Sequence, residues 1–121
     1  MRLSDLAANA EADASRALLN DGYLRLLAGE QMLVEQRFGS PAYRRAVGGV
    51  ADALPLRQVV AALADGTADT YRAYAADGVT LIEDGTVGES STSDLVLDRA
   101  EVRAGALVSV TRLTYRVPNG E

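Results

Sequence analysis

Turn-forming residue pairs that contain glycine interrupt this chain at short intervals, and their spacing limits the structures that it can form. After Gly22 the apolar runs are only a few residues long and end at pairs such as Asp77-Gly78 and Ala104-Gly105. Asp-Gly is a preferred sequence in tight hairpin turns. Short strands with turns every eight to twelve residues or so are typical of sandwiches and barrels. The sequence therefore predicts a mainly β, antiparallel sandwich or barrel-like domain.

Seven runs have the length and composition of strands. Two of them follow each other closely, which predicts an antiparallel pair. The last run is the longest, and its alternation slips near Thr111-Arg112, as a β-bulge would produce. The runs are Tyr23–Gly29, Met32–Gly39, Tyr43–Val50, Thr67–Ala75, Val79–Ile82, Asp94–Asp98 and Leu107–Val117.

Three further segments are interpreted from their glycines and apolar spacing. Gly48-Gly49 inside the third run indicates a bulge or a close backbone approach. Asp84-Gly85 predicts a turn after Ile82. Residues 55–64 fit two structures: their apolar residues have helical spacing, but they also form a short run that a strand could use.

The first segment predicts one α-helix over residues 4–20. Ser4 is a candidate N-cap, and Gly22 suits the left-handed position after the last turn. One face is apolar but consists mainly of small side chains, which permit close approach of a neighbour. This face could pack on the domain core or dock a subunit; because it offers little bulk to a core, we predict docking. It comprises Leu3, Leu6, Ala7, Ala10, Ala14, Ala17 and Leu18.

Composition fits one globular domain spanning residues 1–121, with a helix at 4–20 and a β-sandwich body at 23–117. The 121 residues are 48% hydrophobic and 24% charged, which argues against wholesale disorder. The chain has no Cys, His, Trp or Lys, and its 12 basic residues are all Arg. These absences exclude thiol and imidazole nucleophiles, Schiff-base lysines and zinc sites built on Cys or His. We therefore expect no enzyme.

Charge and hydropathy also limit the partners. The net charge is −5 and the isoelectric point is near 4.7, whereas nucleic-acid-binding domains usually carry a basic stripe. The N-terminal residues lack the apolar core of a signal peptide, and no run approaches the length of a membrane span. We expect a protein that is made in the cytoplasm and binds neither nucleic acid nor a membrane.

Carboxylates are the remaining candidates for chemistry. Glu83-Asp84 and the Asp94/Asp98 pair could be offered as acid/base pairs, but strand neighbours point to opposite faces. Two segments rich in oxygen and glycine, Asp65–Asp69 and Glu83–Gly85, could be calcium loops, yet neither has the ligand spacing of an EF-hand. Ordinary turn chemistry explains these acids better. We expect no catalytic residue, metal or cofactor.

The second half of the chain resembles a family of small tailed-bacteriophage proteins. The shared pattern is Gly-Thr-Ala-x-x-aromatic-Arg-x-Tyr, a turn and a Gly-x-Val-Gly exit, and with the helix and first strand it spans nearly the whole chain. The Arg-rich middle, Arg37–Arg57, is shorter than in the family. The matching segments are Gly66–Tyr74, Asp77–Thr80, Asp84–Gly88, Asp94–Leu97 and Val108–Tyr115.

This resemblance implies a virion structural protein with a β-sandwich body and no catalytic residues, and it favours a strand within residues 55–64. We expect a homo-oligomeric capsid decoration (cement) protein, located in the virion, whose partner is the major capsid protein or another virion protein. The alternatives are a tail, baseplate or fibre component, or a host-surface or carbohydrate-binding module. The candidate subunit-contact residues are Leu3, Leu6, Ala10, Leu18, Arg44 and Arg45.

Overall fold

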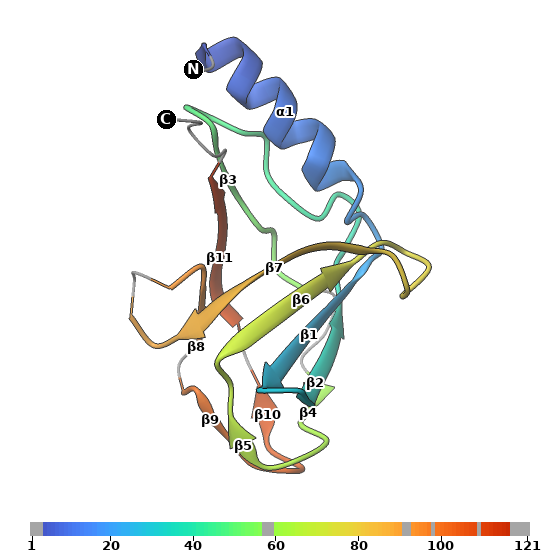
Figure 1. Cartoon of the computed structure of the whole chain (residues 1–121). Coiled ribbons are helices and arrows are strands. Elements are labelled where there is room, and N and C mark those ends of the chain that lie inside the picture. Colours follow the sequence, from blue (N-terminus) through green and yellow to red (C-terminus); the bar gives the residue numbers. More distant parts are fainter. Residues whose placement is uncertain (1–3, 57–59, 91–92, 98, 109, 117–121) are drawn as a thin grey trace.

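The computed structural model describes residues 4–56, 60–90, 93–97, 99–108 and 110–116, and it is mainly β with one N-terminal helix, as predicted (Figure 1). Helix α1 spans Asp5–Ala17, and Ser4 caps it by accepting a hydrogen bond from the Ala7 N–H through its side chain. The strands are β1 Tyr23–Ala28, β2 Gln31–Arg37, β3 Val50–Asp52, β4 Val60–Ala61, β5 Gly66–Thr67, β6 Thr70–Tyr74, β7 Leu81–Gly88, β8 Leu95–Leu97, β9 Glu101–Val102, β10 Leu107–Val108 and β11 Val110–Arg116.

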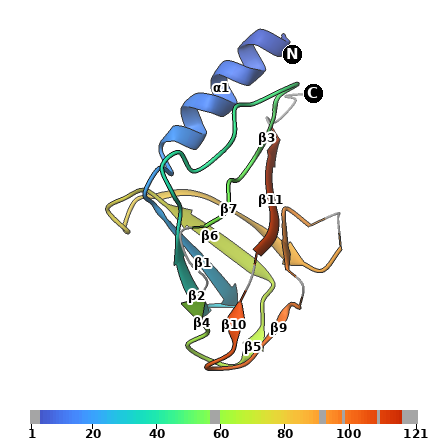
Figure 2. The same ribbon diagram turned by 180° about the vertical axis from the view of Figure 1, so that it is seen from behind.

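One strongly curved sheet of seven strands forms the body, in the order β2-β1-β6-β7-β8-β11-β3. Its neighbouring strands are antiparallel except β7 and β8, which run parallel with Val87 beside Leu95, a pairing that the sequence did not predict. Two small sheets, β10-β4 and β5-β9, complete the body. Both views place α1 at one end of the molecule, beside β3, and the small sheets at the other end (Figures 1 and 2).

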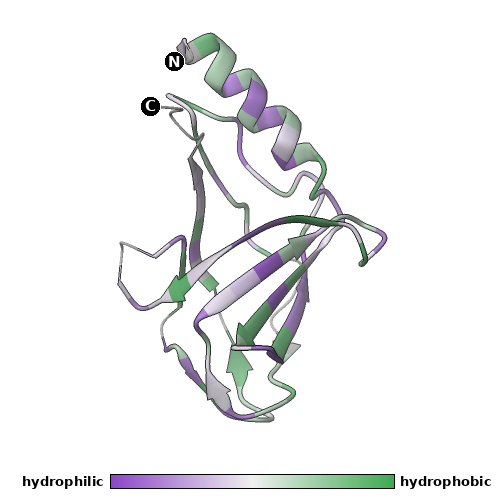
Figure 3. Cartoon of the chain, in the orientation of Figure 1, coloured by the Kyte–Doolittle hydropathy of each residue, from purple (hydrophilic) through white to green (hydrophobic). Residues whose placement is uncertain are grey.

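The pair β1-β2 confirms the antiparallel hairpin predicted from the two closely spaced runs. Leu24 and Leu26 alternate into the core, and a register shift after Leu26 lets the next residue, Leu27, be buried as well. Hydrophobic and hydrophilic residues therefore alternate along much of the strand (Figure 3). The bulge predicted near Thr111-Arg112 is also confirmed, because the register of β11 against β8 shifts between Val110 and Arg112.

The predicted strand over Tyr43–Val50 is wrong for most of its length. Only single bridges join Tyr43 to Ala53 and Val47 to Val50, and β3 begins at Val50. Gly48 and Gly49 have φ values of 61° and 76°, so they form a tight turn and not a bulge. Two successive residues with positive φ are what a hairpin turn of this kind requires.

The predicted turn at Asp84-Gly85 is also wrong, because both residues lie inside the continuous strand β7. Gly85 serves close packing: an added Cβ would lie 2.7 Å from the Tyr71 ring and from the Asp94 carboxylate. The end of α1 also differs from the prediction that Gly22 takes the left-handed position. Asp21 adopts the left-handed conformation, with φ 60°, and Gly22 is needed because a Cβ there would lie 2.2 Å from the Tyr74 carbonyl oxygen.

Residues 55–64 contain the short strand β4, in agreement with the interpretation that the family resemblance favoured, and no helix among those that the structure describes. Residues 57–59 lie outside the described residues. The core lies inside the curved sheet and extends under α1. Its largest fully buried side chains are Leu19, Leu24, Leu26, Leu33, Val34, Phe38, Leu95 and Leu97.

Candidate interaction surface

Helix α1 turns one face toward the body, and this face is only partly apolar. Ala8, Ala12, Arg16 and, just after the helix, Leu19 are buried. Arg16 is 4% exposed, and arginine is almost never buried to this extent unless its charge is paired. The inward face of α1 therefore contains a charged side chain and small residues where an amphipathic helix usually places its bulky apolar ones.

Polar side chains on α1 and the turn after it bind the segment between β2 and β3. The side-chain oxygens of Asn9, Asp13 and Asn20 each accept a hydrogen bond of 2.8 Å from a backbone N–H. The donors are Gly49, Ala46 and Ala42, in an order that runs antiparallel to the helix. These bonds satisfy backbone groups that pair with no neighbouring strand, so the segment is held along α1 from Asn9 to the turn after the helix.

Arg16 connects α1 to the sheet. Its guanidinium forms an ion pair with Glu83 of β7 and lies over the rings of Tyr115 and Tyr43, 3.8 Å and 5.1 Å from their centroids. The Tyr115 hydroxyl donates to the carboxylate of Glu11, one turn earlier on the helix. The ion pair and the stacked rings together fix the orientation of α1 against β7 and β11.

Burial determines how this cluster titrates. Desolvation raises the pKa of Glu83, and the attraction and hydrogen bond of Arg16 lower it only in part. Desolvation acts to lower the pKa of Arg16, but the interactions with Glu83 raise it above its ordinary value. Burial also raises the pKa of the Tyr43 and Tyr71 hydroxyls well above the usual range. Arg16 stays charged and both tyrosines stay neutral at physiological pH, which suits a structural joint.

The other face of α1 points to solvent, and we call it the outward face. It contains the apolar residues that the sequence singled out: Leu6 is 82% exposed and Leu18 57% exposed. Leu3 lies outside the described residues. Packing of this face on the chain's own core, one of the two uses considered above, is therefore wrong for the described residues. The outward face consists of Leu6, Ala7, Ala10, Ala14, Ala17 and Leu18, all exposed.

Arg44 and Arg45 lie beside the second half of α1. Both are exposed, and neither forms an ion pair or side-chain hydrogen bond with the residues that the structure describes. With Asp13, Ala17 and other residues they line a shallow hollow of about 180 Å³ between the helix and the segment that follows Pro41. Ala17 is the residue of the outward face that lines this hollow, so the structure places Arg44 and Arg45 beside one end of that face.

The acidic residues considered for chemistry have structural partners. Glu83 points inward to Arg16 while Asp84 is exposed, so the two carboxylates diverge. The Asp65 carboxylate accepts from the Ala104 N–H, and that of Asp69 accepts from the Gly29 N–H and the Thr70 hydroxyl. Asp94 accepts from the Thr86 N–H, and Asp98 lies outside the described residues. Within the described ranges, no three acidic side chains are grouped to hold a metal ion.

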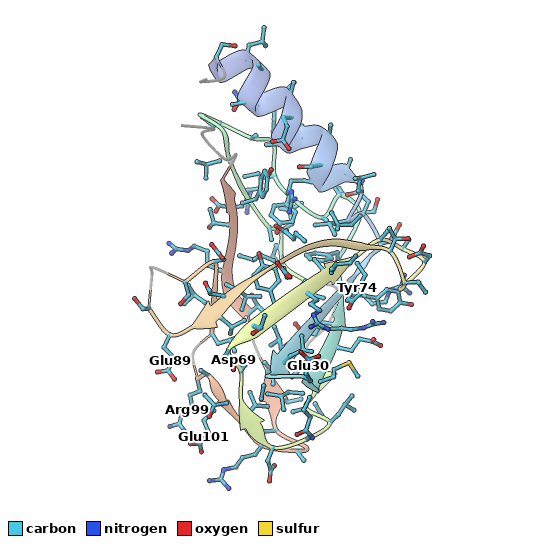
Figure 4. The ribbon with its side chains drawn as sticks, viewed as in Figure 1. Glu30, Asp69, Tyr74, Glu89, Arg99 and Glu101 are labelled. Carbon is cyan, nitrogen blue, oxygen red and sulfur yellow. The ribbon has the colours of Figure 1, made fainter. Side chains whose placement is uncertain are left out.

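The outer face of β2, β1 and β6 carries a row of stacked side chains that the sequence analysis missed. The Arg37 guanidinium lies 4.5 Å from the Tyr23 ring centroid, and that of Arg25 lies 4.3 Å from the Tyr74 ring centroid. Arg25 also forms an ion pair with Glu35. Figure 4 shows Tyr74 on this sheet and, farther from α1, the acidic residues Glu89 and Glu101. The aromatic rings are thus already engaged by arginines of the same chain.

Comparison with protein-family models, with curated proteins and with solved structures finds no match. Among the described residues, no helix combines the length and apolar character that crossing a membrane requires. The outward face of α1, with Arg44 and Arg45 beside one end of it, is an exposed apolar surface that internal packing does not explain. Further apolar side chains are exposed elsewhere among the described residues, namely Val47, Leu63, Val79, Leu81 and Leu107.

Proposed function

We propose that this protein is a structural protein of a tailed-bacteriophage virion, a capsid decoration protein that binds the outer shell. The observation that carries the proposal is the outward face of α1, whose leucines and alanines are exposed while polar side chains hold the opposite face to the body. An exposed apolar face on a rigidly held element is typical of a surface that another subunit covers. The family resemblance supplies the virion as the setting.

Energetics favour a covered face. Burying one leucine side chain contributes roughly 1.5–3 kcal/mol, and α1 exposes two leucines together with four alanines. One such contact is weak, but a shell presents the same site many times, so small contributions suffice when copies bind side by side. Arg44 and Arg45 add charge at one edge of the surface and suit an acidic group on the shell.

Binding to capsids tests this proposal. Purified protein is mixed with capsids that lack it, and co-sedimentation is measured for the wild type and for Ala14→Glu. The substitution places a charge in the centre of the outward face and should abolish binding, while the exposed control Ala76→Glu should bind like the wild type. Equal binding by both variants would show that the outward face is not the contact.

Copy number per virion separates the proposal from its nearest alternative. A decoration protein occupies repeated symmetry positions and should be present on the order of hundreds of copies. A tail, baseplate or fibre component should be present in tens of copies or fewer, roughly the scale of a single appendage. Quantitative mass spectrometry of purified virions measures this number. A low copy number would indicate that the protein belongs to the tail and not to the shell.

A further inference from the structure

We propose that residues 99–108, which we call the edge segment, bind an extended segment of a partner protein as an added strand, with acidic side chains that meet Arg99 and Arg103. The edge segment lies at the end of the molecule opposite α1, so this inference goes beyond the proposed function (Figure 1). Three observations carry it: the backbone edge is open, a hollow with an apolar floor lies along it, and arginine predominates on the rim of that hollow.

The two small sheets are the halves of one two-stranded ribbon. Their register is the same, because in both sheets each step forward along residues 60–68 is one step back along the edge segment. The hydrogen bond from the Ala62 N–H to the Ala106 carbonyl oxygen belongs to this register as well. A tight turn at residues 103–106 separates the halves. The edge segment is therefore one strand of the ribbon, interrupted at its middle.

Only the other strand, at residues 60–68, joins the ribbon to the body. Its Leu63 N–H donates to the Leu33 carbonyl oxygen of β2. Among the described residues, every backbone-to-backbone hydrogen bond of the edge segment goes to the other strand or stays within the turn. The far side of the edge segment is thus an open sheet edge, a row of backbone groups to which another chain can add a strand.

The ladder geometry identifies the backbone groups that point outward. In an antiparallel pair, hydrogen-bonded and non-hydrogen-bonded positions alternate. Ala106 accepts a bond across the ribbon, so the next residue, Leu107, occupies a non-hydrogen-bonded position. The same holds for Ala100 and Glu101 in the other half. The N–H and C=O groups of Leu107 and Glu101 therefore point away from the ribbon, where an extended segment can bond to them.

A hollow of about 360 Å³ lies along this open edge. Its lining, among the described residues, comes entirely from the edge segment. Val102 and Val108 are buried and form an apolar floor, whereas Leu107 is 74% exposed beside them. Strand addition obtains affinity from main-chain hydrogen bonds and specificity from hollows that receive alternate side chains. The apolar floor suits an aliphatic side chain of the added strand.

Two arginines and one carboxylate form the rim of the hollow. Arg103 pairs with Glu101, 3.4 Å apart, whereas Arg99 forms no ion pair or side-chain hydrogen bond with the described residues. Figure 4 shows Arg99 and Glu101 at the outer side of β9. Glu89, on the same flank, accepts from the Ala100 N–H and forms no ion pair with Arg99.

The rim charges alternate along the edge segment, because Arg99, Glu101 and Arg103 are two residues apart. Opposite charges across neighbouring strands attract, and like charges repel. The matching strand is therefore acidic, basic and acidic at alternate positions, with aliphatic residues between them. Charged side chains on an open edge also discourage pairing with strands of unmatched charge. These charges make the edge selective for such a partner.

Peptide binding tests the inference on the full-length protein. The probe is a labelled synthetic peptide, Glu-Val-Lys-Val-Glu, and its control is the charge-reversed Lys-Val-Glu-Val-Lys. Fluorescence anisotropy at low salt should show binding of the first peptide only. The chain as a whole carries a charge of −5, so a non-specific effect would favour the reversed peptide.

Two variants of equal charge change locate the binding site. Arg99→Ser should weaken binding of the Glu-Val-Lys-Val-Glu peptide about fivefold, the effect of one surface charge pair. Ala76→Glu, an exposed position between β6 and β7, should bind it as the wild type does. Circular dichroism verifies that both variants are folded. Equal affinities of the two variants would place the peptide elsewhere on the protein.

Backbone chemistry shows whether the peptide is added as a strand. Saturating peptide should slow hydrogen exchange of the Glu101 and Leu107 amides about tenfold, because both N–H groups gain an acceptor. Two further peptides are N-methylated, one at its charged residues and the other at its valines. Only one of these two sets faces the edge in a strand, so one peptide should fail to bind and the other should bind.

Four results would overturn the inference. They are no peptide binding up to about 1 mM, the weak limit of specific association; equal binding of the charge-reversed peptide; equal binding of both N-methylated peptides; and protection of the Glu101 and Leu107 amides by a second copy when the protein is concentrated without peptide. These measurements need no capsid. A protein that binds capsids but no peptide contradicts this inference alone, and one that binds the peptide but no capsid contradicts the proposed function alone.

Discussion

Arg16 illustrates how a single residue determines the position of the candidate surface. Its side chain is buried between α1 and the sheet, paired with Glu83 and stacked on Tyr115 and Tyr43. A buried ion pair adds little to stability when compared with well-packed apolar residues, yet removal of one partner leaves the other charge buried alone. The pair therefore holds one orientation of the helix, the orientation that leaves the outward face exposed.

Replacement of Arg16 by methionine should lower the stability of the fold strongly, whereas the same replacement at Arg72 should lower it little. Arg16→Met leaves Glu83 without its cation and is expected to lower the free energy of unfolding by about 3–5 kcal/mol. Arg72→Met removes a pair between a half-buried arginine and the exposed Glu30, 3.6 Å apart, and should cost about 1 kcal/mol or less. Urea denaturation measures both. The double variant Arg16→Met/Glu83→Gln should recover much of the loss, and additive losses would contradict a coupled pair.

Two glycines should respond to alanine for different reasons. Gly22→Ala brings a Cβ to within 2.2 Å of the Tyr74 carbonyl oxygen, so the backbone of β6 or of the turn must move. Gly29→Ala meets no atom within 4 Å but retains a left-handed φ of 60°, which costs about 1–2 kcal/mol. We expect Gly22→Ala to be the more destabilising variant in thermal denaturation. If Gly29→Ala proves the more destabilising variant, the Tyr74 carbonyl of β6 does not approach Gly22 as closely as described.

At the scale of the element, α1 packs on the body through small and polar side chains. Asn9 and Asp13 hydrogen-bond to backbone N–H groups of the segment after β2, Ala8 and Ala12 are buried, and the residues of the outward face point to solvent. Backbone groups that are removed from water must find partners, and three side-chain oxygens on or just after the helix supply them. This requirement outweighs the gain from burying a few small apolar side chains.

Two alanines two residues apart on α1 test this orientation. Ala12 is fully buried, so Ala12→Gln must force a polar side chain into a packed core and should destabilise the fold by about 1–3 kcal/mol. Ala14 is exposed, so Ala14→Gln should change stability by no more than about 0.5 kcal/mol. Chemical denaturation measures both variants. Equal costs, or a larger cost for Ala14→Gln, would mean that the helix is turned the other way.

At the scale of the whole molecule, the pH dependence of stability reflects the buried carboxylate. Because burial raises the pKa of Glu83 in the folded state above its ordinary 4.5, the folded state binds a proton more tightly there than the unfolded state does. Its stabilising contribution is complete below about pH 4.5 and is lost as the pH rises through the folded pKa. The stability of the wild type relative to Glu83→Gln should therefore decrease from acidic to neutral pH, as measured by urea titration.

Asp77 provides a control of opposite sign. Hydrogen bonds from the Thr80 side chain and from the Thr80 and Val79 N–H groups lower the pKa of Asp77 from 3.8 to about 2. Its contribution is present above about pH 3.8 and is lost as the pH falls toward 2. The stability of the wild type relative to Asp77→Asn should thus decrease on acidification. Parallel trends for the two variants would contradict the cause assigned to Glu83.

At the scale of the whole molecule, removal of divalent cations by a chelator should not change the thermal stability of the protein. The carboxylates of Asp65 and Asp69 already accept hydrogen bonds from the chain, so no cation is needed to hold these loops. Thermal denaturation with and without EDTA should give the same Tm, because a bound ion would add ligand-linked stability that chelation removes. A decrease in Tm that calcium reverses would show that the candidate calcium loops, Asp65–Asp69 and Glu83–Gly85, bind a metal ion.

Local chemistry explains which parts of the fold could be predicted. Ser4 at the start of the helix, the Asp77-Gly78 turn and the alternation of β1 each depend on residues close together in the chain. One prediction failed because a distant partner decides: Asp84-Gly85 forms no turn, since Gly85 lets Tyr71 and Asp94 approach β7. Another failed on a local feature, because Gly48-Gly49 is itself the hairpin turn between Val47 and Val50 where a bulge was predicted.

For the candidate surface too, some features follow from the sequence alone and others only from the tertiary structure. The sequence by itself determined that α1 is a helix with a stripe of small apolar residues, because periodicity and capping are properties of consecutive residues. Only the tertiary structure decided that this stripe points to solvent. The backbone amides of the segment after β2 and the carboxylate of Glu83 need polar partners, and the polar side of α1 is the one that supplies them. Those partners are 22 to 67 residues away along the chain, a separation that no local pattern encodes.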